Sequence, residues 1–129
     1  MTDFIEGAVL YIDKPLHWSS FRVVRVVRAK LCHKLGIKKL KVGHAGTLDP
    51  LATGVMTLCT GRMTKQIDRL QAETKEYMAS IRLGATTPSF DLETEIDGEY
   101  PTDHITQQLV EEALIRFTGE IMQIPPRFS

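Results

Sequence analysis

The stretch that decides the interpretation of this sequence is residues 43–54, Gly43-His44-Ala45-Gly46-Thr47-Leu48-Asp49-Pro50-Leu51-Ala52-Thr53-Gly54. Its glycines, proline and threonines are unfavourable inside a helix or a strand, so we expect a loop. Pro50 disfavours the helical conformation for the residue before it, which predicts an extended Asp49 with a fixed carboxylate direction. A loop aspartate is more often a turn residue or a helix cap than a catalytic group. From the residues alone, both interpretations of Asp49 stay open.

Helices and strands are predicted on both sides of this loop. Before it, an apolar run predicts a strand at 8–12, and Ser19 or Ser20 caps a helix that continues to Leu31. A lysine-rich connection then covers 32–42. After the loop we expect a strand at 55–60, a short helix at 64–70, an alternating strand at 75–83, an acidic loop at 86–98 and a helix at 106–117. The elements show no regular βαβ alternation, which favours the α+β class.

The formal net charge of zero conceals an uneven distribution of charge along the chain. Residues 1–70 contain twelve Lys and Arg against five Asp and Glu, whereas residues 71–129 contain four against eleven. This asymmetry suits a basic half that contacts a polyanion, but an uneven solvated surface is an equally common explanation. Arg22, Arg25 and Arg28 form a basic stripe on the predicted helix, for which contact with solvent is the commoner explanation.

Composition and cysteine content limit the class of protein. Hydrophobic residues make up 43% and charged residues 25% of the 129 residues, as in an ordinary globular domain. No apolar run approaches the ~18–20 residues that span a membrane, and the N-terminus is acidic where a signal peptide is basic. We therefore expect a cytoplasmic protein without membrane contact. Cys32 and Cys59 lack partners at metal-ligand spacing, so we expect thiols and no metal site.

Four segments, in the same order, resemble the TruB family of bacterial tRNA pseudouridine synthases. The loop at 43–54 is similar to the family's signature loop. The other similar segments are Asp13-Lys14-Pro15 with Ser19-Ser20, Gly61 with Thr64-Lys65, and Lys75-Glu76-Tyr77 through Leu83-Gly84 with Thr87 and Asp91. The similarity extends to the final Pro125-Pro126-Arg127-Phe128-Ser129. It implies the pseudouridine synthase catalytic-domain fold, an α+β fold whose mixed, largely antiparallel sheet has flanking helices.

The resemblance also implies a function and a set of site residues. The reaction would be a cofactor-free isomerisation of the T-loop uridine of tRNA to pseudouridine. Asp49, at the family's aspartate position, would be the nucleophile that attacks the uracil ring or the ribose of a flipped-out base. Tyr77 would stack on that base, His44 would support the opened T-loop, and Lys14 would lie beside the site. Contacts to the RNA backbone would come from Arg22, Arg25, Lys39 and Lys41. The expected partner is the T-arm stem-loop of tRNA, with no obligate protein partner.

The chain departs from the family pattern in sequence and in length. His17 stands where the family usually has glycine, Ala45 where well-known members have threonine, and Thr47 where some have alanine. The family continues past its Pro-Pro-Arg-Phe-Ser stretch with the rest of the catalytic domain and an RNA-binding tail. That part includes an arginine that pairs with the catalytic aspartate. We therefore interpret residues 1–129 as an apparently truncated N-terminal portion of a catalytic domain, and we expect this chain alone to be inactive.

Alternative functions stay compatible with the sequence. A guide-RNA-dependent relative has a similar loop, although Leu51-Ala52-Thr53-Gly54 looks more like the stand-alone bacterial form. A non-catalytic RNA-binding or assembly fragment is the alternative of a different class. Without the resemblance, Tyr77 would be interpreted as a core tyrosine on its strand, and His44 and Lys14 as ordinary polar residues. A product assay beside a tRNA-binding assay separates these possibilities.

Overall fold

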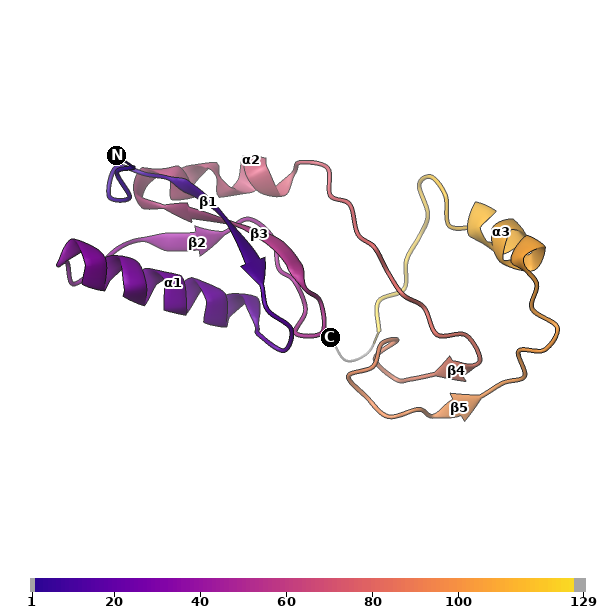
Figure 1. The fold of residues 1–129 in the computed structure, drawn as a ribbon. Coiled ribbons are helices and arrows are strands. Elements are labelled where there is room, and N and C mark those ends of the chain that lie inside the picture. Colours follow the sequence, from indigo (N-terminus) through magenta and orange to yellow (C-terminus); the bar gives the residue numbers. More distant parts are fainter. Residues whose placement is uncertain (1, 127–129) are drawn as a thin grey trace. The chain divides into compact units, whose positions relative to one another are not determined.

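The first sheet has three strands, in the order β1-β3-β2 (Figure 1). The computed structural model describes residues 2–126. The strands are β1, Val9–Lys14, β2, Val42–His44, and β3, Gly54–Thr60. Both outer strands run antiparallel to β3. Helices together with antiparallel sheets confirm the predicted α+β class.

The strand register decides which loops meet at one edge of this sheet. Lys14, the last residue of β1, lies opposite Gly54, the first residue of β3. The segment that leaves β1, residues 15–19, and the segment that enters β3, residues 45–53, therefore emerge at the same edge. The predicted loop at 43–54 begins within β2, whose last residue, His44, pairs with Leu58.

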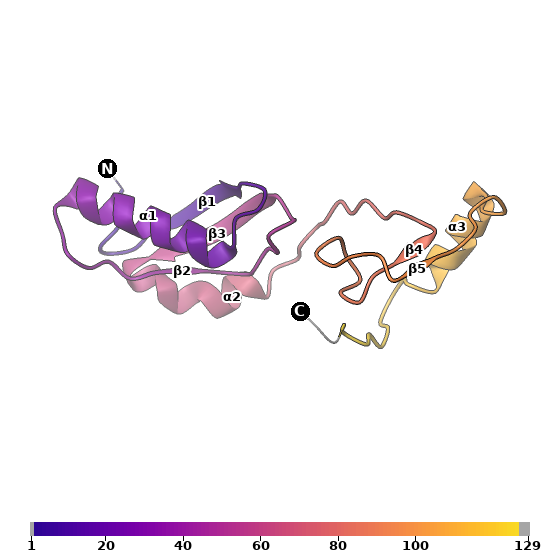
Figure 2. The same cartoon turned by 90° about the horizontal axis from the view of Figure 1, so that it is seen from below.

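Helix α1, Ser20–Leu35, covers one face of the sheet (Figures 1 and 2). The side chain of Ser19 accepts a hydrogen bond from the Arg22 N–H at 3.2 Å and caps the helix, as predicted. The helix ends at Gly36, which has a left-handed φ of 64°. It continues past the predicted end at Leu31. No helix within the described residues is long and apolar enough to cross a membrane.

The hydrophobic core lies between α1 and the sheet. Alternate residues of each strand point to the face that α1 covers, and α1 contributes the adjacent residues Val23 and Val24. Burying each large apolar side chain contributes about 1.5–3 kcal/mol. The buried members are Val23, Val24, Met56 and Leu58, and the partly buried residues around them are Leu10, Ile12, Trp18, Val27, Val42 and Leu48.

The opposite face of the sheet is covered only in part. The predicted helix at 64–70 is instead a 3-10 helix, η1 (Gly61–Gln66), followed by the short helix α2 (Ile67–Gln71). Ile67 packs over β2, because a Cβ atom on Gly43 would lie 2.7 Å from the Ile67 Cδ1. Farther along the sheet, Tyr11 and Val55 stay exposed.

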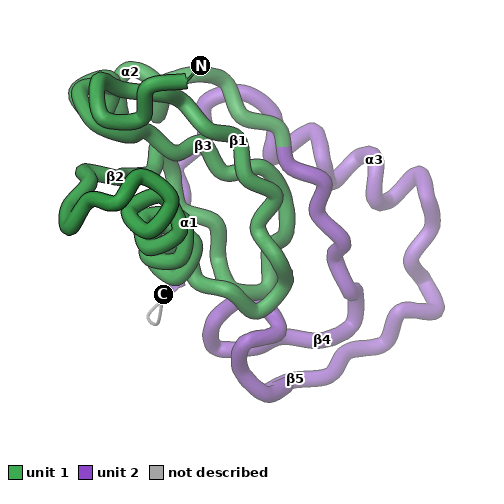
Figure 3. The backbone as a smooth tube through the Cα atoms, turned by 60° about the vertical axis from the view of Figure 1, so that its left-hand side comes forward, with its two compact units in different colours: residues 1–76 green, residues 77–129 purple. Residues whose placement is uncertain are grey.

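The chain divides into two compact units, residues 1–76 and residues 77–129, and the second unit has its own short sheet (Figure 3). Its two short strands, β4 (Ala85–Thr86) and β5 (Gly98–Glu99), pair antiparallel and flank the predicted acidic loop. Helix α3 is Gln107–Ile115, capped by Thr106, and it is shorter than the predicted 106–117. All buried hydrophobic residues of the described part belong to the first unit, so the apolar stripe of α3 is exposed.

The predicted strand at 75–83 is wrong. Residues 74–82 form neither helix nor strand, and all of their side chains are exposed. Alternation of apolar residues gives a segment two different faces, but a strand also needs a neighbour that completes its backbone hydrogen bonds. No described residue pairs with this segment. At the C-terminus, the similarity noted at Arg127-Phe128-Ser129 lies outside the described residues.

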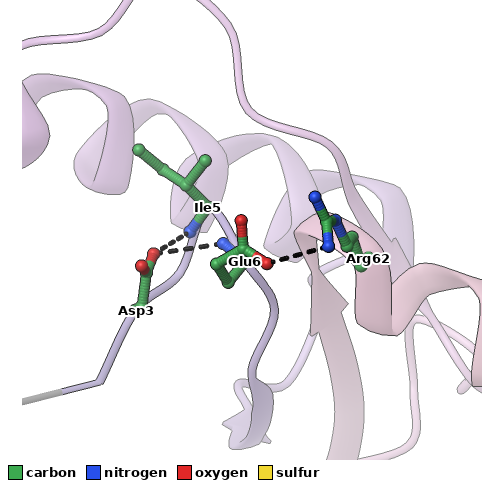
Figure 4. A network of polar contacts seen from close by, with 4 residues as sticks. All are labelled: Asp3, Ile5, Glu6 and Arg62. Carbon is green, nitrogen blue, oxygen red and sulfur yellow. Dashed lines mark hydrogen bonds and ion pairs between the residues drawn. The ribbon is translucent and has the colours of Figure 1, made fainter.

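The N-terminal segment forms a hook against the start of η1 (Figure 4). The Asp3 carboxylate accepts hydrogen bonds from the N–H groups of Ile5 at 2.9 Å and Glu6 at 3.1 Å. Glu6 also pairs with Arg62 at 3.2 Å, but both side chains are exposed, so this pair contributes at most about 1 kcal/mol. Gly61 restricts the position of the N-terminal segment more strongly than this ion pair does, because a Cβ atom on Gly61 would overlap the carbonyl oxygen of Ile5.

Gly61→Ala is expected to destabilise the first unit more than Gly36→Ala does. Both glycines have left-handed φ values, 51° and 64°, so each substitution costs about 1–2 kcal/mol in backbone strain. Only Gly61 adds a steric overlap, which raises its cost by about 1–3 kcal/mol, whereas nothing lies within 4 Å of a Cβ on Gly36. Urea unfolding of both variants measures the difference. Equal losses would contradict the docked hook.

Candidate functional site

The candidate site is the loop that carries Asp49, at the sheet edge where residues 15–19 and 45–53 emerge. The Ala52 N–H donates to the Asp49 carbonyl oxygen at 3.0 Å, which closes a four-residue turn. Aspartate at the first position and proline at the second suit such a turn. The Asp49 side chain is exposed, and within residues 2–126 no hydrogen bond or ion pair engages its carboxylate.

The residue before Asp49 is fixed by a buried serine. The Ser20 hydroxyl donates to the Leu48 carbonyl oxygen at 2.8 Å and accepts from the Leu48 N–H at 2.9 Å. Ser20 is only 4% exposed, so both bonds are shielded from water. The hydroxyl therefore satisfies both backbone groups of Leu48, whose side chain packs against the hydrophobic core.

The residue after Asp49 is fixed from the segment that follows β1. The Pro50 carbonyl oxygen accepts a hydrogen bond from the His17 N–H at 2.7 Å. The ammonium group of Lys14 lies 3.5 Å from the same oxygen, and it also donates to the carbonyls of Trp18 at 2.7 Å and Pro15 at 3.1 Å. Lys14 is fully buried, and these three carbonyls match the three donors of an ammonium group.

These contacts hold the backbone on both sides of Asp49 and leave its carboxylate free. The arrangement suits a nucleophile or a base, because the group needs no rearrangement before it meets a bound molecule. Lys14 has the contacts of a residue that shapes this loop, and a direct contact with substrate stays a prediction. The sequence indicates Ser20 as a possible helix cap and as part of a segment that resembles the family, but it predicts no contact for the hydroxyl. Two adjacent hydroxyls, where one cap suffices, were the signal for its second role.

His17 has a left-handed backbone with φ of 65°, which costs a residue with a side chain about 1–2 kcal/mol. In this conformation its N–H reaches the Pro50 carbonyl. Glycine, which is usual at this position in the resembling family, can adopt such a conformation with little strain. The strained backbone of His17 therefore contributes a hydrogen bond that holds the loop at Pro50.

Two of the other predicted site residues are well defined within their own units. His44 is half-buried at the end of β2, and its Nδ1 lies 2.9 Å from the Gly46 carbonyl oxygen. A carbonyl can only accept, so Nδ1 donates this hydrogen bond, and Nε2 has no partner among the described residues. Tyr77 is the first residue of the second unit, and its side chain is exposed. Their contacts with substrate stay predictions.

In the second unit, a network of hydrogen bonds surrounds Asp91. The Thr87 hydroxyl donates to the Asp91 carbonyl oxygen at 2.6 Å, and the Ser89 hydroxyl donates to its carboxylate at 2.6 Å. The Ser89 hydroxyl, with the N–H of Glu93 at 2.9 Å, lowers the pKa of the Asp91 carboxyl by stabilising its ionised form. The segment with Thr87 and Asp91, which resembles the family in sequence, is therefore an acidic loop held by its own hydrogen bonds.

The four residues proposed to contact an RNA backbone are all exposed. Arg22 and Arg25 lie on α1, whereas Lys39 and Lys41 precede β2. The Arg22 guanidinium lies 4.1 Å from the ring centre of Trp18, a cation–π contact that orients it on the surface. Residues 1–76 contain thirteen Lys and Arg against seven Asp and Glu, so the unit with Asp49 is also the basic one.

The two thiols and the acidic and histidine side chains form no further site among the described residues. Burial raises the pKa of the Cys59 thiol, so this fully buried group stays protonated at neutral pH. Cys32 is a half-buried free thiol. No cluster of three or more His, Cys, Asp and Glu suited to a metal ion occurs within residues 2–126.

Comparison with known proteins places this geometry in context. Residues 33–129 match the protein family described as TruB family pseudouridylate synthase (N terminal domain). The chain is 68% identical over 127 residues to the tRNA pseudouridine synthase B of Phocaeicola vulgatus, a match that covers 98% of the chain and 54% of the relative. It is 56% identical over 128 residues to the protein of that name from Flavobacterium johnsoniae, covering 98% of the chain and 56% of the relative. The chain thus spans about half the length of these curated relatives.

His17→Gly is expected to raise the free energy of unfolding by up to about 1 kcal/mol, because relief of the left-handed strain outweighs the greater freedom of glycine in the unfolded chain. Leu16→Gly is the matched control. Leu16 is an exposed neighbour without a positive φ, so its variant should lose about 0.5–1 kcal/mol. Denaturant unfolding compares the two. A loss at His17 as large as at Leu16 would show that the left-handed conformation carries no strain.

Proposed function

Because this chain belongs to the TruB family of pseudouridylate synthases, we propose that it supplies the catalytic aspartate of an enzyme that isomerises the T-loop uridine of tRNA to pseudouridine. The relatives named above are tRNA pseudouridine synthases, which supports tRNA rather than a guided RNA as the substrate. The reaction breaks the bond from N1 to C1′ and forms one from C5 to C1′. The proton lost from C5 is balanced by one gained at N1. An isomerisation with this balance needs no redox cofactor.

Asp49 is the nucleophile in this proposal. A carboxylate attacks the uracil ring or the ribose only when it is ionised and accessible. The observation that carries the assignment is the contrast between an exposed Asp49 side chain and its two anchored neighbours, Leu48 and Pro50. An ordinary surface turn does not need a buried hydroxyl and a buried ammonium group to hold it. A turn that must aim one carboxylate at a reacting atom does.

The other site residues act around the base that Asp49 attacks. The uridine has to leave its stack before a side chain can reach it, and this costs a few kcal/mol. Tyr77 stacks on the flipped base, and an aromatic stack of this kind contributes about 1–3 kcal/mol. His44, whose Nδ1 is committed to Gly46, offers Nε2 to the opened T-loop. Lys14 supports the site from behind the loop.

Residues 1–129 are, in this proposal, the N-terminal portion of the catalytic domain. Among the described residues no cation lies against the Asp49 carboxylate. The resemblance implies an arginine that pairs with the catalytic aspartate, and this arginine would belong to the half of the relatives that this chain does not span. A carboxylate that is buried against a substrate is less easily kept ionised without a cation. The 129-residue chain alone is therefore expected to be inactive.

Asp49→Asn is expected to reduce pseudouridine formation by about 1000-fold or more in a version that has the full length of the relatives, because the amide keeps the shape but is not a nucleophile. Binding of tRNA should stay within about threefold, and stability within about 0.5 kcal/mol, since the side chain is exposed. The readout is the yield of pseudouridine in a T-arm stem-loop. Asp68→Asn, an exposed aspartate of α2, is the control and should be fully active. Turnover by the Asp49 variant within tenfold of the parent would refute the assignment.

Binding of a T-arm stem-loop is expected to weaken steeply with salt, because each phosphate contact releases a counterion. Charge reversal at Arg25 or Lys39 should each lower the slope of log K against log salt by about one. Reversal of the exposed Arg116, which follows α3, should leave the slope unchanged. Fluorescence anisotropy across a salt series measures all three. A flat dependence for the parent would remove the electrostatic part of the proposal.

A further inference from the structure

The buried hydroxyl of Ser20 has a role that capping of α1 does not explain. Ser19, the residue before it, already serves as the N-cap by accepting from the Arg22 N–H. The Ser20 hydroxyl points instead at the loop. It donates its proton to the Leu48 carbonyl oxygen and accepts a hydrogen bond from the Leu48 N–H. These two bonds connect positions 28 residues apart in the sequence.

Leu48 has no other described partner for either backbone group. A buried peptide group without hydrogen bonds is strongly disfavoured. The position of the Ser20 hydroxyl therefore determines the position of the loop at Leu48. That position is itself well defined. Ser20 is the first residue of α1, and this helix is packed on the sheet by the buried Val23 and Val24.

We infer that Ser20 is a positioning residue for Asp49. The rigid first turn of α1 holds the Leu48 peptide, and the Leu48 peptide determines where the next residue, Asp49, presents its carboxylate. The inference rests on the proposed function in that Asp49 is the residue being positioned. The Ser20 hydroxyl itself makes no contact with substrate, because Ser20 is buried.

The chain offers a matched pair of variants to separate positioning from stability. Ser20→Ala removes both bonds to Leu48, whereas Ser19→Ala removes the cap of the same helix and leaves Leu48 untouched. Ser20→Thr keeps the hydroxyl and is the conservative variant. Amide hydrogen exchange of the 129-residue chain reports the contact directly. In Ser20→Ala the Leu48 amide should exchange about tenfold faster or more, while in Ser19→Ala the Arg22 amide is the one that accelerates.

Product formation reports the consequence, in a version with the full length of the relatives. Ser20→Ala should lower kcat about 10- to 100-fold and leave KM within about threefold, because a misplaced carboxylate slows the chemical step more than it weakens RNA binding. Ser19→Ala should keep kcat within about twofold, and Ser20→Thr should recover most of the parent rate.

The outcomes distinguish this inference from the proposed function. Equal kcat losses in Ser19→Ala and Ser20→Ala would overturn the inference, because both would then act through the stability of α1. A Ser20→Ala enzyme with the parent kcat would also overturn it, even though Asp49→Asn remained inactive. An active Asp49→Asn enzyme would instead refute the proposed function. Even then, an unchanged rate of hydrogen exchange at the Leu48 amide in Ser20→Ala would show that the Ser20 hydroxyl does not hold the Leu48 peptide.

Discussion

Hydrogen bonds hold the backbone of two residues, Leu48 and Pro50, and the exposed carboxylate between them is the candidate catalytic group. The Ser20 hydroxyl holds the peptide groups of Leu48, and the His17 N–H with the Lys14 ammonium holds the Pro50 carbonyl. All three donors lie in the segment from the last residue of β1, Lys14, to the first residue of α1, Ser20. The antiparallel pairing of β1 with β3 brings that segment to the loop. The site therefore depends on the strand register as much as on the loop sequence.

Two features of this anchoring lower the stability of the folded state, and the other contacts of the first unit offset them. A fully buried ammonium group loses its hydration, and only its three carbonyl partners compensate for that loss. His17 adopts a left-handed backbone, which disfavours the folded state further. Unfavourable conformations that a surrounding structure maintains are concentrated at functional sites. Here both occur within four residues, Lys14 to His17, and both contact the carbonyl of Pro50.

Much of the architecture was predictable from the sequence, because the pattern of each element is local. The cap at Ser19, the strand ending at Thr60 and the loop around Pro50 follow from residue types that favour those conformations. The segment at 75–83 was mispredicted as a strand because alternation is a property of one segment, whereas a strand needs a partner. Asp49 was found through the resemblance.

The contacts that hold Asp49 were beyond prediction from the sequence. They join Ser20 to Leu48 and Lys14 to Pro50, positions far apart in the chain, and such pairs are decided by strand register and helix packing. Lys14 illustrates the difficulty, since a lysine before a proline is usually solvated, and only the fold shows that it is buried.

The loop around Asp49 is expected to be rigid already before any RNA binds. Backbone ¹⁵N relaxation of the free protein measures this directly, through the order parameters of residues 47–53. We expect values of about 0.85, equal to those of the strands, for Leu48 and Asp49. Values below about 0.6 at these two residues, with β3 still rigid, would contradict it, because the carboxylate would then have no fixed direction.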